Sequence, residues 1–271
     1  ELQVRGFVVM EHHFSGRSLL HRFGRAPLDG VNLIAVRPRA RIATWLTAHY
    51  DSKGQPLSMA SRLVAAGLVA LGLVDLASVP LRALLGASRP GLVDAVFGVT
   101  GLVGAALLLG NRATDSSPGA VDNGAGIVTV LAVVDALPPD AGVGVIFADA
   151  EEYGLVGARA VVRERANLFV DTAVVNFDGI DDRGGAVALV HRSGSTVGAV
   201  ARAVDARRRR WLPVLVDGIA FGTVARECVT IMRGDWTTAR IVHTPRDTVE
   251  RLTLEGVRQV AAGVARALQR A

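Results

Sequence analysis

Short apolar runs with strand character alternate with longer helix-like runs along most of this chain, and this alternation restricts the fold more than any other feature. The strand-like runs are 31–36, 42–48, 144–148, 172–177, 186–190 and 229–232, and the helix-like runs are 126–137, 157–165, 196–209 and 254–269. Strands that alternate with helices predict a largely parallel sheet with helices on both faces. The first two strands are expected to be neighbours, joined by a turn at 37–39.

The composition is that of a globular chain with a lean toward membrane contact. Its 271 residues are 50% apolar, which is enough for one large α/β domain or two small ones. The net charge is +5, and almost all of the positively charged side chains are arginines. We expect no nucleic-acid partner. The basic run 207–210 is predicted to be a solvated helix end, with a phosphate- or lipid-headgroup-binding patch as the alternative. The single cysteine, Cys228, excludes a disulfide within the chain and is expected to be buried.

One segment, 59–110, departs from this pattern because it holds only five charged residues. Its second apolar run, 91–109, has about the 20 residues that cross a hydrocarbon core, and its first, 63–79, is near the lower limit. We predict a helical hairpin in the membrane, with a soluble helical pair packed as a lid as the alternative. Asp75 and Asp94 lie within five residues of the central turn, 80–90, so a hairpin would place both near one interface.

Polar side chains lie directly after the predicted strands or in the turn that begins a helix, where α/β folds place their sites. The set consists of His49, Asp122, Glu152, Asp178 and His243. Imidazole and carboxylate ligands together suit zinc or a similar divalent ion. Three carboxylates and two histidines are too many for one catalytic zinc, so they suit two metals about 3.5–4 Å apart that share a bridging carboxylate.

Two local patterns add candidate catalytic groups. Asp51 lies two residues after His49, so its carboxylate could accept the ring N–H and orient that histidine. Glu151 and Glu152 are adjacent acids after a buried strand, and adjacent residues in a loop diverge. One can therefore bind a metal while the other acts as a general base.

Five short motifs occur in a fixed order and are together far more specific than any one alone. They are His49-x-Asp51, Pro118-Gly119-Ala120-x-Asp122-Asn123, Glu151-Glu152-x-Gly154-Leu155-x-Gly157, Asn176-x-Asp178 and His243-Thr244-x-x-Asp247-Thr248. The set resembles the zinc aminopeptidase family that includes aminopeptidase Y and the bacterial leucine aminopeptidases, M28-like zinc exopeptidases. It covers essentially the whole chain outside 59–110. The resemblance implies a three-layer α/β/α sandwich with a mixed, mostly parallel sheet, so we expect one exopeptidase domain over 1–271, interrupted by the hairpin.

The resemblance also implies a role for each matched residue. Asp122 would bridge two zinc ions, with His49 and Asp178 completing one site and Glu152 and His243 the other. The general base would be Glu151, which takes a proton from the metal-bridged water, while Asp51 orients the first histidine. The implied activity is removal of N-terminal residues from peptide substrates.

Two other functions stay open alongside this one. Glutaminyl cyclases share the fold and most ligands, and they imply acyl transfer with a single zinc. A membrane scaffold that has lost its metals is the second alternative, against which the complete ligand set argues. We also expect that residues precede Glu1, that the protein is membrane-associated through 59–110, and that its catalytic domain lies outside the cytoplasm.

Overall fold

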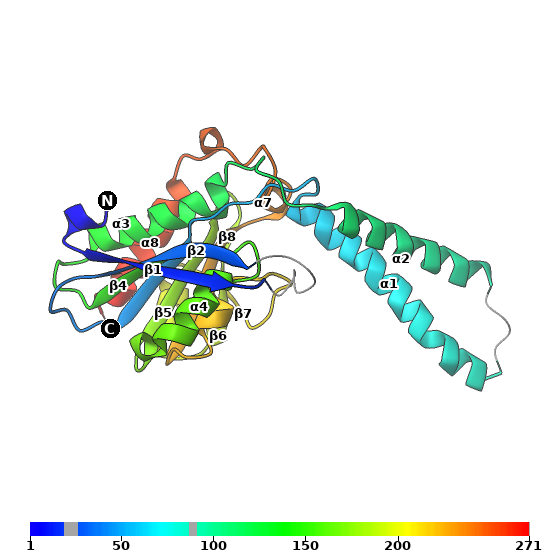
Figure 1. Ribbon diagram of the computed structural model, residues 1–271, viewed down its shortest axis with the longest axis horizontal. Helices are drawn as coiled ribbons and strands as arrows, with labels where there is room; N and C mark the ends of the chain where they lie inside the picture. The colour runs from blue at the N-terminus through cyan, green and yellow to red at the C-terminus, as the bar shows by residue number, and fades with distance from the viewer. Residues whose placement is uncertain (19–26, 87–90, 271) are drawn as a thin grey trace.

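The computed structural model describes residues 1–18, 27–86 and 91–270, and its centre is a mixed eight-stranded sheet (Figure 1). The strand order is β1-β2-β4-β3-β5-β8-β6-β7. The strands are β1 (Val8–Gly16), β2 (Leu28–Val36), β3 (Thr44–His49), β4 (Val143–Ala148), β5 (Ala173–Ile180), β6 (Gly185–Arg192), β7 (Arg207–Arg209) and β8 (Glu227–Gly234). The four central strands β4, β3, β5 and β8 run parallel. Strands β1 and β2 pair antiparallel with their neighbours, and β6 pairs antiparallel with β8 and parallel with β7.

Helices follow the strands in the expected alternation. The α-helices of the sheet-bearing part are α3 (Ala125–Ala136), α4 (Val156–Arg165), α5 (Ser195–Ala203), α6 (Gly218–Phe221), α7 (Trp236–Ala239) and α8 (Glu255–Leu268). Shorter helical segments are η1 (Gln3–Arg5), η3 (Ala120–Gly124), η4 (Ala166–Phe169) and η5 (Val249–Arg251). The α/β class and the mixed sheet are therefore confirmed.

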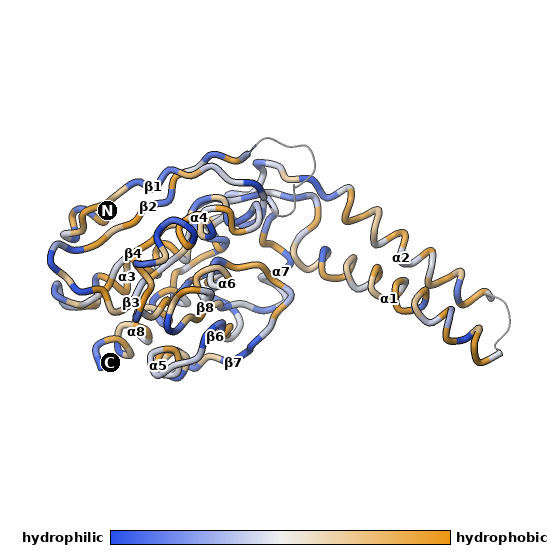
Figure 2. The backbone as a smooth tube through the Cα atoms, turned by 60° about the horizontal axis from the view of Figure 1, so that its bottom comes forward, coloured by the Kyte–Doolittle hydropathy of each residue, from blue (hydrophilic) through white to orange (hydrophobic). Residues whose placement is uncertain are grey.

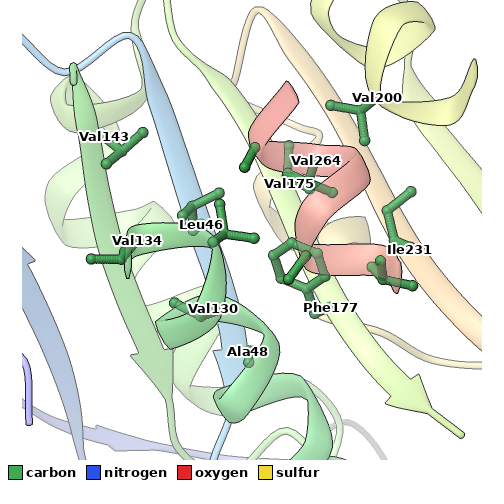
Figure 3. Packing of buried hydrophobic residues seen from close by; sticks show 14 of the residues in the cluster. Leu46, Ala48, Val130, Val134, Val143, Val175, Phe177, Val200, Ile231 and Val264 are labelled. Carbon is green, nitrogen blue, oxygen red and sulfur yellow. The ribbon is translucent and has the colours of Figure 1, made fainter. Parts of the chain in front are cut away.

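Two apolar clusters hold the helices against the sheet. Successive residues of a strand point to opposite faces, and along β3 the side chain of Trp45 belongs to one cluster while that of Leu46 belongs to the other. The Leu46 cluster includes residues of α3, α5 and α8, such as Val130 and Val264 (Figure 3). The Trp45 cluster includes residues of α4 and α6. The helices thus pack on both faces and leave the strand ends free to hold polar side chains.

Three details of the sequence prediction are wrong. The first two predicted strands are not neighbours, because β4 inserts between β2 and β3. The helix expected over 196–209 ends at Ala203, and Arg207–Arg209 forms the exposed strand β7 beside β6. Strand β1 is absent from the prediction because its exposed edge position lets it carry polar residues within an otherwise apolar run. Cys228 is buried, as expected.

The apolar insertion forms an antiparallel helical arm that projects from the sheet (Figure 1). Its helices are α1 (Met59–Leu84) and α2 (Leu92–Gly110). They approach closely at glycines, since a Cβ built on Gly72 would lie 2.8 Å from the Gly101 Cα. Both are apolar along most of their length (Figure 2), and only 6% of each apolar window is buried. By length and composition, both helices could cross a membrane.

The arm differs from the predicted hairpin near its tip. Helix α1 continues through Pro80 to Leu84, so Asp75 lies nine residues, or about 14 Å, before the helix end. The prediction that Asp75 lies beside the turn is therefore wrong. Its carboxylate pairs instead with Arg82, at 3.0 Å, and the same guanidinium pairs with Asp94 on α2. An ion-paired cluster thus compensates charges inside the arm.

Candidate metal centre

The five predicted metal ligands meet at one edge of the sheet, where the parallel strands end. His49 is the last residue of β3, Asp178 lies near the end of β5, Glu152 follows β4, Asp122 lies in η3 and His243 lies between α7 and η5. All five side chains are buried. Strand polarity explains the convergence, because parallel strands bring their carboxyl ends to the same edge.

These residues form two groups with ligand spacing. One group contains His49, Glu151 and Asp178, and the other contains Asp122, Glu152 and His243. Within each group, one nitrogen or oxygen atom from every residue lies within 4.8 Å of the others. Glu151, expected to be the base, therefore sits within the first group, at a distance that suits a ligand or a base.

Asp122 lies between the two histidines. Its Oδ1 is 3.1 Å from His49 Nε2, and its Oδ2 is 2.8 Å from His243 Nε2. Burial raises the pKa of the Asp122 carboxyl, but hydrogen bonds to the two histidines outweigh it and hold the pKa well below the usual range. Each carboxylate oxygen faces one group, which is the arrangement that a bridging ligand requires.

The backbone around Asp122 is fixed by a second carboxylate. Asp247 accepts hydrogen bonds from the amides of Val121, at 2.8 Å, and Asp122, at 3.2 Å. Asn123 donates to the carbonyl of Phe177 on β5, at 2.9 Å. The loop that carries Asp122 is therefore tied both to the loop after His243 and to the strand that carries Asp178.

Asp51 has a different geometry from the one expected. The closest acceptor to His49 Nδ1 is the backbone carbonyl of Asp51, at 3.0 Å, whereas its carboxylate lies 3.5 Å away. That carboxylate accepts hydrogen bonds from the backbone amides of Glu151, at 3.0 Å, and Glu152, at 3.1 Å. Asp51 thus orients the histidine mainly through its main chain, and its side chain holds the loop that carries both glutamates.

A family model described as peptidase family M28 matches residues 32–268. The chain belongs to this family. The resemblance found in the motifs is confirmed, and it covers the metal centre described above. A search of curated proteins found no significant match.

Solved structures show the same fold at low sequence identity. The LapA aminopeptidase of Legionella pneumophila is 15% identical, with a TM-score of 0.54, over 97% of this chain and 58% of that one. BSAP, a zinc aminopeptidase from Bacillus subtilis, is 17% identical, with a TM-score of 0.57, over 89% and 50%. A glutaminyl cyclase from Porphyromonas gingivalis is 15% identical, with a TM-score of 0.62, over 99% and 86%. This M28 chain therefore spans 58% of the length of one aminopeptidase and 50% of the other.

The donor set of this M28 chain fits divalent metal ions. Glu152 Oε1 is buried without a hydrogen-bond partner among the described residues, although it lies 3.0 Å from His243 Nε2. The other oxygen, Oε2, is 3.1 Å from Lys53 Nζ. An unpartnered carboxylate oxygen that faces an imidazole nitrogen is costly unless a cation binds it. The orphaned oxygen is therefore the sharpest sign of a metal position.

The remaining carboxyls of the centre have raised pKa values. Burial raises the pKa of Glu151 well above its usual range, and nearby Asp178 adds to this effect although His49 opposes it. Burial likewise raises the pKa of Asp178 to about 7. Carboxyl groups packed this closely in a low-dielectric site cannot all ionise without added positive charge.

Asp217 is a further carboxyl that sequence reasoning did not assign to the site. It is fully buried, and neither oxygen has a hydrogen-bond partner among the described residues. Burial raises its pKa to about 8, with Asp51 and Asp178 contributing and His49 opposing. Its segment, 216–221, belongs to none of the five motifs, so the sequence alone does not single it out.

Replacing Asp217 by Asn is expected to change how stability depends on pH. The unfolded chain loses this proton near the usual pKa of 3.8, whereas the folded chain keeps it up to about pH 8. The free energy of unfolding of the parent therefore falls as pH rises through this window, because only the folded state still holds the proton. The variant has no titratable group at this position and lacks this decrease. In chelator-treated samples, the Tm of Asp217→Asn minus that of the parent should grow by several degrees between pH 5 and pH 8. A constant difference across this range would contradict the raised pKa.

Proposed function

We propose that this chain is a zinc-dependent exopeptidase that removes N-terminal residues from peptides. The main support is the pair of buried ligand groups that face the two oxygens of Asp122. Membership in a peptidase family supports peptide-bond hydrolysis, and the zinc aminopeptidase BSAP among the similar structures supports zinc. A cavity of about 620 Å³ opens on Asp122, Glu151 and His243 and gives a peptide access to the centre.

The protein groups divide the chemistry between them. His49 and Asp178 would hold one ion, Glu152 and His243 the other, and Asp122 both. Bound divalent ions polarise a scissile carbonyl and lower the pKa of water toward neutrality. Glu151 would accept the proton, and the burial that raises its pKa supports this role.

The same residues suggest why the enzyme would act at chain ends. Carboxylates from Asp122, Glu151, Glu152 and Asp178 line the cavity. A protonated α-amine is the part of a peptide that such a surface attracts most strongly, and an internal peptide bond lacks it. Glu151, once protonated, can pass its proton to the leaving amine.

Glu151→Gln should lower kcat by about 10²- to 10⁴-fold, because the amide retains the shape of the side chain but cannot accept the proton. Zinc content, measured by atomic emission, should stay that of the parent. The matched control is Glu250→Gln, which alters a fully exposed glutamate and should leave kcat unchanged. Full activity in Glu151→Gln would exclude Glu151 as the base.

The number of bound metal ions separates the three candidate functions. The proposed peptidase should bind two zinc ions per chain, and a chelator should abolish hydrolysis of an aminoacyl fluorogenic substrate. A single bound zinc together with cyclisation of N-terminal glutamine would favour a glutaminyl cyclase. A purified protein that binds no zinc under saturating conditions would favour a non-catalytic scaffold.

We further propose that α1 and α2 anchor the protein in a membrane. At 1.5 Å per residue, helix α2 spans about 28 Å and α1 about 39 Å, against a hydrocarbon core of about 30 Å. Large apolar side chains such as Leu73, Val74 and Leu102 are more than half exposed, which a bilayer accommodates and water does not. The extracytoplasmic position of the catalytic domain stays a prediction.

Replacing 59–110 with a short Gly-Ser linker should move the protein from the membrane to the soluble fraction. The ends of the arm are close, because the amide of Leu57 donates to Asn111 Oδ1 at 2.9 Å and a β-bridge joins Gly54 to Thr114. The sheet should therefore fold without the arm. Carbonate washing of membranes that contain the parent is the control for peripheral binding. Equal partitioning of both proteins would favour a packed helical pair over an anchor.

A further inference from the structure

The first turns of the arm form part of the wall of the site cavity. Met59, Leu63 and Ala66 of α1, together with Leu108 of α2, line it on one side. The segment 212–216, which is mostly apolar, lines it as well. The arm is therefore part of the substrate-binding surface at its base, in addition to the anchor that its outer turns form.

Arg62, in the first turn of α1, brings a positive charge to this wall. Its Nη2 lies 2.5 Å from His243 Nδ1 and 3.5 Å from Met59 Sδ. Among the described residues, its Nε is buried with no hydrogen-bond partner, and no carboxylate pairs with the guanidinium within 4.0 Å. A buried guanidinium nitrogen without an acceptor is costly, so this donor calls for a ligand.

The other cationic side chains that line the cavity are already engaged. Lys53 donates to the Glu152 carbonyl at 2.7 Å and pairs with its carboxylate. Arg233 donates to the carbonyls of Asp181 and Asp182, both at 3.0 Å. Among the three, Arg62 alone has a buried nitrogen without a partner in the part of the chain that the structure describes.

If His243 binds a metal ion, Arg62 also loses its hydrogen bond to this histidine. Its Nε2 faces Asp122 and Glu152, so this nitrogen must present a lone pair to an ion there. The other nitrogen, Nδ1, then carries the proton and donates to Gln55 Oε1, which lies 3.0 Å away. A protonated Nδ1 cannot accept from Arg62. The guanidinium is thus free to bind a group of the substrate.

We propose that Arg62 binds a substrate carboxylate one residue beyond the scissile bond, and that the preferred substrates are dipeptides with apolar side chains. The guanidinium is one imidazole ring away from the ligand cluster, and a residue spans about 3.5 Å. A carboxylate at the end of a dipeptide therefore reaches Arg62 while its α-amine meets the cavity carboxylates. The apolar wall supplied by α1, α2 and 212–216 accepts the side chains.

This inference rests on the proposed peptidase function, so its test measures binding without turnover. Zinc-loaded full-length Glu151→Gln protein in detergent is titrated by calorimetry with Leu-Leu and with its C-terminal amide, Leu-Leu-NH2. The free dipeptide should bind about 10- to 100-fold more tightly, as expected for a charge-assisted hydrogen bond. Adding Arg62→Met should abolish this difference, whereas Arg62→Lys should keep part of it.

The source of the carboxylate is resolved by a third ligand, Leu-Glu-NH2. Tight binding of this amide that depends on Arg62 would assign the interaction to an acidic side chain, and weak binding would assign it to the chain terminus. Arg112→Met, which removes an exposed arginine just beyond α2, is the matched control and should preserve the preference for Leu-Leu. Thermal melting and zinc content establish that each variant is folded and loaded.

Tight Arg62-dependent binding of Leu-Glu-NH2 would overturn the preference for apolar dipeptides. Two further results would overturn the role of Arg62, and they differ in what they mean for the proposed peptidase function. If Arg62→Met weakens both Leu-Leu and its amide equally, or leaves the preference intact, Arg62 does not bind the carboxylate, while the peptidase function stands. If neither peptide binds the zinc-loaded Glu151→Gln protein, the cavity is not a peptide site, and both proposals fail.

Discussion

The concentration of buried carboxylates around Asp122 is the constraint on which the rest of this structure depends. Asp122, Glu151, Glu152 and Asp178 line one cavity, and the buried Asp217 interacts electrostatically with Asp178. Placing so many acids in a low-dielectric interior is unfavourable unless cations or protons compensate. Burial raises the pKa values of three of these carboxyls, which reflects the cost of ionising them together. Divalent cations would compensate more fully, which is why the acids are better explained as ligands than as a stabilising network.

The sheet topology makes this concentration possible. Residues far apart in the sequence reach the same edge because β4, β3 and β5 run parallel and end there. Loop hydrogen bonds then fix the final positions. The carboxylate of Asp51 holds the Glu151–Glu152 turn, and that of Asp247 holds the loop of Asp122. Two acids that bind backbone amides therefore position the acids that face the cavity.

Sequence patterns predict most of the strands and helices, and short motifs single out the five residues that the fold brings to one edge of the sheet. They predict strand order poorly, since nothing local in 31–48 reveals that β4 inserts between β2 and β3. They also miss residues whose role depends on the path of the chain. Arg62 is separated from His243 by 181 positions, and only the fold brings their side chains together. Asp51 was identified correctly as a neighbour of His49, but its main-chain contact could not be inferred from residue type.

The position of the arm in the chain explains how it can affect the site without disturbing the sheet. It is inserted between β3, which ends with His49, and η3, which carries Asp122. Its two ends are held together by the Gly54–Thr114 bridge, so both ligands keep their places whatever the length of the arm. An insertion at this point necessarily has its base beside the metal centre. The first turn of α1 can therefore add a charged group and an apolar wall to the cavity, while the outer turns project away from the sheet (Figure 1) and can enter a bilayer.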